Sequence, residues 1–405
     1  MTELLYRNVV DVGAARDTVL SSTRRLEVEQ AGVINALGRT LAEDVAAGAD
    51  LPPHYTAATD GYAAISSDTN GVTTKTPCSL GLLSASSSPH TKHLEPGTVM
   101  KVHQGDRLPS GADTVVPAGA AFAPDGGPEV LIRAESQVGE NIIVPGAFAS
   151  AGEVAIDRGT VIGPGEMGLI ASLGLPGVAV TRKPRLAVIT TGASVVDIVD
   201  EMEGGQVRNS ARYTLVGMVL ESGCDLGRLI HVTDGRVGLE RALAESMTSD
   251  AIIVALGRDD KHDMAIQAMN NSGALCFERI LMEPGAATAF GTVDEKSVFI
   301  TADHAVLEVF EALIRPALLT MLGGAEVDRT LVRATLGRTV KPNAGPRHYI
   351  KATLAWKKDV FVATPLPAHR AQPRKWTQPN CLIVIPENRN IVKRGETVEA
   401  LALGS

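Results

Sequence analysis

The stretch RLAVITTG, Arg185–Gly192, decides which fold to expect. It is a short apolar run rich in β-branched residues that ends in a glycine, which is typical of a buried strand in a parallel sheet. Asn209 or Ser210 can then cap a helix that Gly223 should end. Further strand and helix patterns alternate to residue 322, with strands at 226–234, 251–257 and 297–301 and helices at 239–247, 264–273 and 303–322. This alternation predicts an α/β domain with a parallel sheet covered on both faces, and Pro316 should kink the last helix.

The sequence on either side of this region has a different character. Residues 46–140 are rich in Gly, Pro, Ser and Thr and contain the strand-like runs GTVMKVHQG and DTVVPAG. Near the C-terminus, HYIKATLAW, DVFVATPL and CLIVIPE are separated by turn residues. The first pattern predicts a β-rich region, and the second predicts a small β-barrel or sandwich.

Length and composition limit the class of protein. A chain of 405 residues is expected to form two to four domains, and its 44% of apolar residues suffice for ordinary globular cores. The four cysteines lie far apart without metal-ligand spacing, as expected for buried thiols in a reducing compartment. No apolar run is long enough to span a bilayer, and MTELLYRNVV is no signal peptide. We therefore expect a soluble, cytoplasmic protein without direct membrane insertion.

Charge is distributed unevenly along the chain. Residues 327–405 hold 14 Lys and Arg against 5 Asp and Glu, whereas residues 1–326 hold 24 against 41. A basic C-terminal module on an acidic body favours an anionic partner for that module. The alternative is a small domain whose lysines and arginines are simply solvated.

Two motifs lie in the N-terminal third of the chain: TAATDGYAA at 56–64 and GDRLPSGADTVVP at 105–117. They resemble the S-A-M-D-G-Y-A-V signature and the G-A-P-L-P-x-G-A-D-x-V-V-P stretch of the MoeA/gephyrin family of molybdenum-insertion proteins. The resemblance continues in order through residues 165–192, 204–223, 314–324 and 393–403. It therefore covers nearly the whole chain.

The resemblance implies an elongated homodimer with four domains per chain, in a MoeA-like α/β multidomain fold. These are a mixed linker domain (27–45 and 141–177), a distal β-rich domain (46–140), a molybdopterin-binding-like α/β domain with a parallel sheet (1–26 and 178–326) and a C-terminal β-barrel (327–405).

The family's activity requires two anions to be bound side by side. Its enzymes hold adenylated molybdopterin beside molybdate, transfer the metal and release AMP, with Mg²⁺ assisting. Lysines, backbone N–H groups and helix N-termini suit such ligands. In this chain the resemblance retains Asp60, Asp234 and Asp263 as remnants of the catalytic carboxylates, and Gly61, Tyr62 and Asn209 as remnants of the cofactor-binding set.

Other charged groups of that site are missing. The family's K-P-G-K-P becomes Glu283-Pro284-Gly285-Ala286-Ala287, so one lysine is replaced by a carboxylate and the other by alanine. At about 4 Å and an effective dielectric near 20, each such interaction with a phosphate is worth about 4 kcal/mol. Four further family segments also depart from their patterns, those at 141–148, 191–194, 256–263 and 299–303.

We therefore expect a catalytically degenerate scaffold, a pseudoenzyme that needs no cofactor. The alternative is a molybdopterin molybdenumtransferase with an altered pocket, using Mg²⁺ with molybdopterin-AMP and molybdate. The run DDKHD (259–263) is expected to be a solvated loop rather than a metal site.

The resemblance also implies how such a scaffold would bind a partner. Gephyrin grips an extended segment of a membrane receptor, and bacterial gephyrin-like members have been proposed as adaptors in cell division, with the acidic tail of FtsZ as a ligand. Local similarity places Arg16, Tyr349, Lys351 and Pro386 at that groove. Recruitment to a division site or a membrane complex would follow. Tyr349 and Pro386 can instead be ordinary packing and turn residues.

Nucleic acid is rejected as the main partner. Trp376 lies among arginines in HRAQPRKWTQPN, but one aromatic residue is too few for a stacking platform and the whole chain is acidic.

Overall fold

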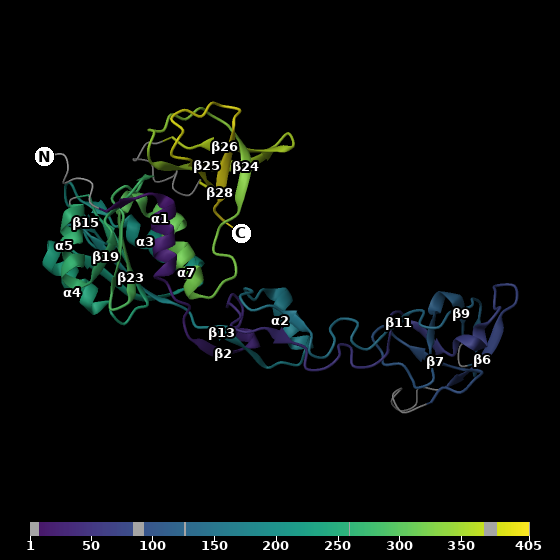
Figure 1. The fold of residues 1–405 in the computed structure, drawn as a ribbon. Coiled ribbons are helices and arrows are strands. Elements are labelled where there is room, and N and C mark those ends of the chain that lie inside the picture. The colour runs from purple at the N-terminus through teal and green to yellow at the C-terminus, as the bar shows by residue number, and fades with distance from the viewer. Residues whose placement is uncertain (1–7, 84–92, 125–126, 259, 368–378, 405) are drawn as a thin grey trace.

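The computed structural model describes residues 8–83, 93–124, 127–258, 260–367 and 379–404. Four compact regions make up an elongated molecule (Figure 1). The distal β-rich region lies at one end, the linker region follows, and the α/β domain lies beside the C-terminal barrel at the other end. The MoeA-like multidomain architecture that the sequence predicts is therefore confirmed.

The α/β domain is built on one six-stranded sheet. Its strand order is β17 (Asp225–Val232), β14 (Arg185–Thr191), β18 (Ala251–Leu256), β23 (Lys296–Ala302), β22 (Ala289–Val293) and β19 (Ala274–Phe277). The first four strands are parallel, as predicted, whereas β22 pairs antiparallel with both β23 and β19. The expected wholly parallel sheet is thus wrong at one edge. A tight turn at Asp294 and Glu295, both with positive φ, joins β22 to β23, and it lacks the Asn-Gly sequence that marks such turns.

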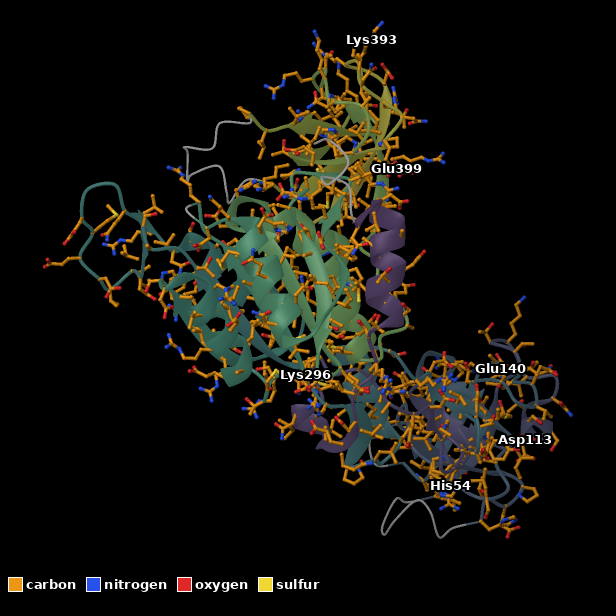
Figure 2. All side chains as sticks on the ribbon, turned by 60° about the vertical axis from the view of Figure 1, so that its left-hand side comes forward. His54, Asp113, Glu140, Lys296, Lys393 and Glu399 are labelled. Carbon is orange, nitrogen blue, oxygen red and sulfur yellow. The ribbon has the colours of Figure 1, made fainter. Side chains whose placement is uncertain are left out.

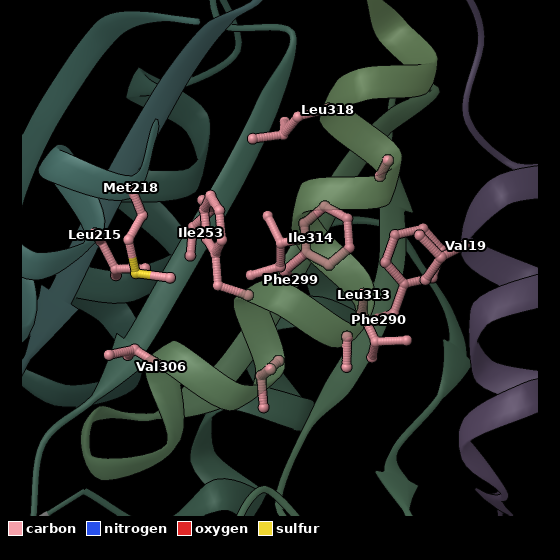
Figure 3. Close-up of a cluster of buried hydrophobic side chains, with 14 of the residues drawn as sticks. Val19, Leu215, Met218, Ile253, Phe290, Phe299, Val306, Leu313, Ile314 and Leu318 are labelled. Carbon is pink, nitrogen blue, oxygen red and sulfur yellow. The ribbon is translucent and has the colours of Figure 1, made fainter. Parts of the chain in front are cut away.

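Helices cover both faces of this sheet, as predicted. One face packs on α1 (Val12–Ser21), α3 (Ser210–Glu221), α6 (Val306–Val309) and α7 (Arg315–Met321), and the other on α4 (Gly235–Glu245) and α5 (His262–Ser272). The first core contains Ile253, Phe290 and Phe299 from the sheet against Leu313 and Ile314 (Figure 3). The rings of Phe290 and Phe299 lie 5.0 Å apart. Asn209 caps α3 by accepting from the Arg212 N–H, as its sequence position predicted.

The predicted long helix at 303–322 is interrupted by a π-helical turn. It begins with a 3₁₀ turn (Asp303–Ala305), continues as α6, widens into the π-helix Phe310–Ile314 and resumes as α7. Pro316 lies in the first turn of α7, where its missing N–H costs least. The irregularity therefore lies one turn before the proline.

The linker region joins two separate stretches of chain. Strand β2 (Val28–Gly32) pairs with β13 (Gly177–Thr181), β3 (Val45–Ala46) pairs with β12 (Val154–Ile156), and α2 spans Pro164–Ser172. The predicted boundary at residue 177 cuts β13, whose Val178 and Val180 pack in the linker core. Arg182 then ties this region to the α/β domain, since it donates two 2.7 Å bonds to Asp250.

The distal region contains a six-stranded sheet and a separate pair of short strands. Its order is β8 (Thr114–Pro117), β5 (Gly61–Ala64), β7 (Thr98–Val102), β6 (Cys78–Leu83), β10 (Glu129–Ile132) and β9 (Ala121–Phe122). Strands β4 (Thr56–Ala57) and β11 (Ile142–Ile143) pair beside it. The two predicted strand-like runs correspond to β7 and β8.

The C-terminal domain is a closed barrel. Strands β25 (Arg347–Lys357), β26 (Val360–Pro365), β24 (Leu331–Leu336), β28 (Thr397–Ala402) and β27 (Cys381–Ile385) pair in that order, and β27 pairs back onto β25. The open choice between barrel and sandwich is thereby settled. A short strand of the α/β domain, β21 (Met282–Glu283), adds to β25 from outside.

No helix within the described residues is long and apolar enough to cross a bilayer.

Candidate functional site

The carboxyl ends of the parallel strands are the first candidate site, because ligands of open α/β sheets bind at this edge. Asn209 lies here, buried, with its side-chain N–H donating 2.8 Å to the Thr190 hydroxyl. His231 of β17 lies 3.0 Å from the same hydroxyl through Nδ1 and 2.9 Å from the Val195 carbonyl oxygen through Nε2. These groups satisfy one another. They hold the loop after β14 in place. The Asn209 side chain is therefore used in hydrogen bonds within the protein.

The retained carboxylates do not gather at this edge within one chain. Asp234 follows β17 and pairs with Arg241 at 2.9 Å, while Asp263, in the first turn of α5, lies 4.0 Å from Arg279. Asp60 precedes β5 in the distal region, where it accepts 2.8 Å from the Gln104 N–H. Gly61 and Tyr62 lie in β5 itself. Because the distal region and the α/β domain are at opposite ends of the molecule (Figure 1), only a second copy could bring Asp60 to Asp263.

Negative charge stands where the family's site needs positive charge. A 3.2 Å contact between the Thr288 and Thr301 hydroxyls holds the segment after Ala287 against the carboxyl-terminal half of β23. Glu283 is exposed in that neighbourhood, and Asp303 begins the 3₁₀ turn that follows β23. Glu283 and Asp303 therefore place two carboxylates near this end of β23, where they would repel a bound anion.

The DDKHD run (259–263) does not form a metal site within the described residues. Asp259 lies outside the described residues. His262 begins α5, and its Nε2–H donates a 2.8 Å hydrogen bond to the Glu278 carbonyl oxygen. Burial lowers the pKa of its imidazole. Within the part of the chain that the structure describes, no three His, Cys, Asp or Glu side chains are grouped to hold a metal ion.

The second candidate site is a groove of about 610 Å³ between α1 and the barrel. Figure 2 shows Glu399 of β28 at the base of the barrel, directly above the purple helix α1. Leu331, Val384 and Leu401 provide apolar surface in the groove. Two carboxylates, Asp328 and Glu399, also line it, together with five arginines: Arg16, Arg329, Arg333, Arg347 and Arg389. We call this the arginine groove. Its lining is basic and partly apolar.

Four of the five arginines are already paired with carboxylates of the chain. Arg16 pairs with Asp328, Arg329 with Glu311, Arg347 with Glu387 at 3.0 Å, and Arg389 with Glu396. Arg333 is exposed on β24 opposite Glu399 of β28, and no ion pair joins it to another described residue. It is therefore the arginine most available to a ligand.

Two ion pairs with buried carboxylates join the barrel domain to the α/β domain. Glu308 of α6 is buried and lies 3.1 Å from the Lys351 ammonium of β25. Burial raises the pKa of Glu308, and Lys351 opposes that rise. Glu311 of the π-turn accepts 3.0 and 3.1 Å bonds from Arg329. Both carboxylates come from the interrupted helix, so this irregular segment holds the two domains together.

The structure brings together three of the four residues predicted for partner binding. Arg16, Tyr349 and Pro386 all line the arginine groove. Lys351 does not, because its ammonium is committed to Glu308. Tyr349 is largely buried in the core shared by the two domains, which raises its pKa, so packing is a main part of its role. Trp376 lies outside the described residues.

Sequence reasoning missed the other four arginines of the groove. They come from the barrel strands, the segment before them and the turn after β27, and no motif joins them. The only signal was the excess of basic residues after residue 327.

Comparison with known proteins adds to this geometry. Residues 10–174 match the model of the MoeA N-terminal region (domain I and II), residues 187–320 a probable molybdopterin binding domain, and residues 333–403 the MoeA C-terminal region (domain IV). Molybdopterin molybdenumtransferases of Bacillus subtilis (strain 168) and Staphylococcus aureus (strain MSSA476) are each 25% identical over 98% of this chain, covering 95% and 96% of those proteins. The crystal structure of the molybdopterin biosynthesis MoeA protein from Pyrococcus horikosii has a TM-score of 0.82 and 25% identity, covering 98% of this chain and all of that one.

Fold and matched domains together define a multidomain protein of the molybdopterin-biosynthesis class. Within that class, the chain belongs to the MoeA family. The Bacillus and Staphylococcus relatives are both named as molybdopterin molybdenumtransferases.

Proposed function

We propose that this MoeA-family protein is a catalytically degenerate, dimeric scaffold that binds an extended acidic protein segment in the arginine groove. One observation carries the proposal: five arginines line a groove with exposed apolar surface, while the carboxyl edge of the α/β sheet has lost the family's lysines. Basic residues around an apolar surface suit a ligand with alternating acidic and apolar side chains.

The partner would be a short protein tail. An acidic tail such as that of FtsZ, or a segment of a membrane receptor, has the required chemistry, and binding would recruit the scaffold to a division site or membrane complex. The groove has a wall in each of two domains, which the buried pairs of Glu308 and Glu311 hold together. A preformed groove lowers the ordering cost of binding.

Replacing Arg333 by glutamate should weaken binding of an acidic tail peptide at least tenfold. The change turns an attraction between Arg333 and a peptide carboxylate into a repulsion. Each such interaction is worth roughly 4 kcal/mol near a protein surface, and half of that already exceeds the 1.4 kcal/mol of a tenfold loss in affinity. Isothermal titration with an FtsZ-tail peptide, at two salt concentrations, measures it. Arg333 is preferable to Tyr349, whose burial would mix binding with stability.

Arg158→Glu is the matched control, because Arg158 is exposed in the linker region and does not line the groove. It should leave peptide affinity unchanged. Equal affinities for the natural chain and Arg333→Glu would remove the groove from the proposal.

Molybdenum insertion is the second candidate, favoured by the full-length similarity to named molybdenumtransferases. The reaction takes molybdopterin-AMP and molybdate as substrates with Mg²⁺. The charges around Glu283 and Asp303 oppose it.

Restoring two lysines tests which reading is right. Glu283→Lys combined with Ala286→Lys should raise the affinity for molybdopterin-AMP more than tenfold over the natural chain, because it replaces repulsion by attraction beside the phosphates. Glu295→Lys, in the exposed β22–β23 turn, changes charge elsewhere and should have little effect. Tight binding by the natural chain, with AMP released on adding molybdate, would instead establish the enzyme and overturn the scaffold.

A further inference from the structure

An exposed loop of the α/β domain has the same chemistry that the arginine groove selects. Residues 197–206 read DIVDEMEGGQ. Ile198, Val199 and Met202 are 57%, 84% and 54% exposed, which is unusual for apolar side chains so close together. Asp200, Glu201 and Glu203 are exposed among them. The loop thus presents apolar and acidic side chains in alternation along one short segment.

The base of this loop is held in place. It leaves β15 (Val195–Val196) and returns through β16 (Val207–Arg208), which pair with each other. The Arg208 guanidinium donates 2.5 Å to the Asp200 carbonyl oxygen, and the Asp197 carboxylate accepts 2.7 Å from the Tyr213 hydroxyl. Asp197 is therefore used within the loop. One Asp200 oxygen accepts a 3.3 Å bond from the Asp197 N–H, and no ion pair joins Asp200, Glu201 or Glu203 to another described residue.

The loop and the groove of one chain lie on different sides of the α/β domain. In Figure 1, β15 is at the left edge of this domain, whereas α1 and the barrel strand β28 lie on its right. No residue of 197–206 lines the groove. Contact between the two surfaces therefore requires two molecules.

We propose that loop 197–206 of a second copy docks in the arginine groove, so that the protein associates with itself in a head-to-tail manner. Ile198, Val199 and Met202 would cover the apolar surface of Leu331 and Leu401, and the carboxylates would face Arg333 and its neighbours. Among the arginines that line the groove, Arg333 has no ion pair with a described residue, and its charge complements the acidic loop. The two surfaces differ, so the contact does not close on itself and can extend to a chain of molecules.

This inference rests on the proposed function, since it names an occupant of the same groove. It also implies a form of regulation, because a docked loop and a partner tail would compete for the groove. Dilution or added salt would dissociate the loop and free the groove for the tail.

A synthetic peptide of residues 195–206, labelled with a fluorophore, tests the contact directly on the full chain. We expect saturable binding by fluorescence anisotropy, weakened at least tenfold by Arg333→Glu and by raising salt from 50 to 300 mM. A peptide of the same composition in scrambled order separates fit from charge alone and should bind at least tenfold more weakly. Arg158→Glu should bind the peptide as the natural chain does.

Sedimentation velocity of the full chain provides the second readout. The natural chain should show concentration-dependent assembly beyond the dimer, and Arg333→Glu should abolish that further assembly. Asp200→Lys with Glu201→Lys should abolish it too, and the combination of all three changes should restore it, because the charges are then exchanged. Failure of the 195–206 peptide to bind, while an acidic tail peptide binds the groove, overturns the inference and leaves the proposed function standing. If neither peptide binds, both fall.

Discussion

Arg329→Ala should lower the free energy of unfolding by about 3–5 kcal/mol, because it leaves the carboxylate of Glu311 buried without its partner. Glu311 is almost fully buried, and both of its oxygens accept bonds from Arg329. Removing the guanidinium returns none of the cost of having taken the carboxylate out of water. The measurement is the midpoint of urea unfolding, followed by a probe in the α/β domain.

A pair on the surface provides the control for this change. Arg24 and Glu295 are 82% and 83% exposed at 3.5 Å, so Arg24→Ala should shift stability by no more than about 0.5 kcal/mol. Combining Arg329→Ala with Glu311→Leu should recover part of the loss, since no charge is then left unpaired. Equal effects of Arg329→Ala and Arg24→Ala would mean that the Glu311 pair does not stabilise the domain contact.

Lys351→Met should produce a loss of stability that depends on pH. Burial already raises the pKa of Glu308 above its value in the unfolded chain, and removing Lys351 removes the main opposing influence. The folded variant then holds a proton that the unfolded chain has released, so its stability falls as pH rises through the folded pKa. At pH 8 we expect a deficit of about 3–5 kcal/mol relative to the natural chain. At pH 5 the deficit should shrink, as thermal unfolding at both pH values will measure.

Glu308→Gln separates the charge from the shape of the side chain. In the Lys351→Met background it should remove the dependence on pH between 5 and 8, because the titrating group is gone. A deficit in Lys351→Met that stays constant across this range would contradict a charged Glu308 as its cause.

Much of the α/β domain was predictable because its signals are local. Apolar β-branched runs such as Arg185–Gly192 predict buried strands, and Asn209 and Gly223 predict where α3 begins and ends. The antiparallel strands β22 and β19 were missed because Asp294 and Glu295 take positive φ without the usual turn sequence. Pro316 indicated an irregularity in the last helix, but the apolar pattern there did not show that it takes the form of a π-turn at Phe310–Ile314.

The candidate site was predictable only where a local likeness existed. That likeness assigned Arg16, Tyr349, Lys351 and Pro386 to a partner-binding groove. The structure places three of them in the lining of the arginine groove, whereas Lys351 pairs with Glu308. No residue near Lys351 in the sequence indicates that it pairs with Glu308, a buried carboxylate of another domain. For the same reason Arg333 could not be singled out, since its availability depends on which arginines the fold has already paired.

The added strand β21 has a consequence for dissecting the molecule. Met282 and Glu283 pair with Arg347 and His348, so one border of the barrel is completed by a piece that lies some 60 residues earlier in the chain. A fragment that starts at residue 327 would lack β21 and expose unpaired backbone groups of β25. Such an exposed strand edge favours aggregation between copies. Transplanting the barrel onto another protein therefore requires carrying the 282–283 segment along or capping the vacated edge.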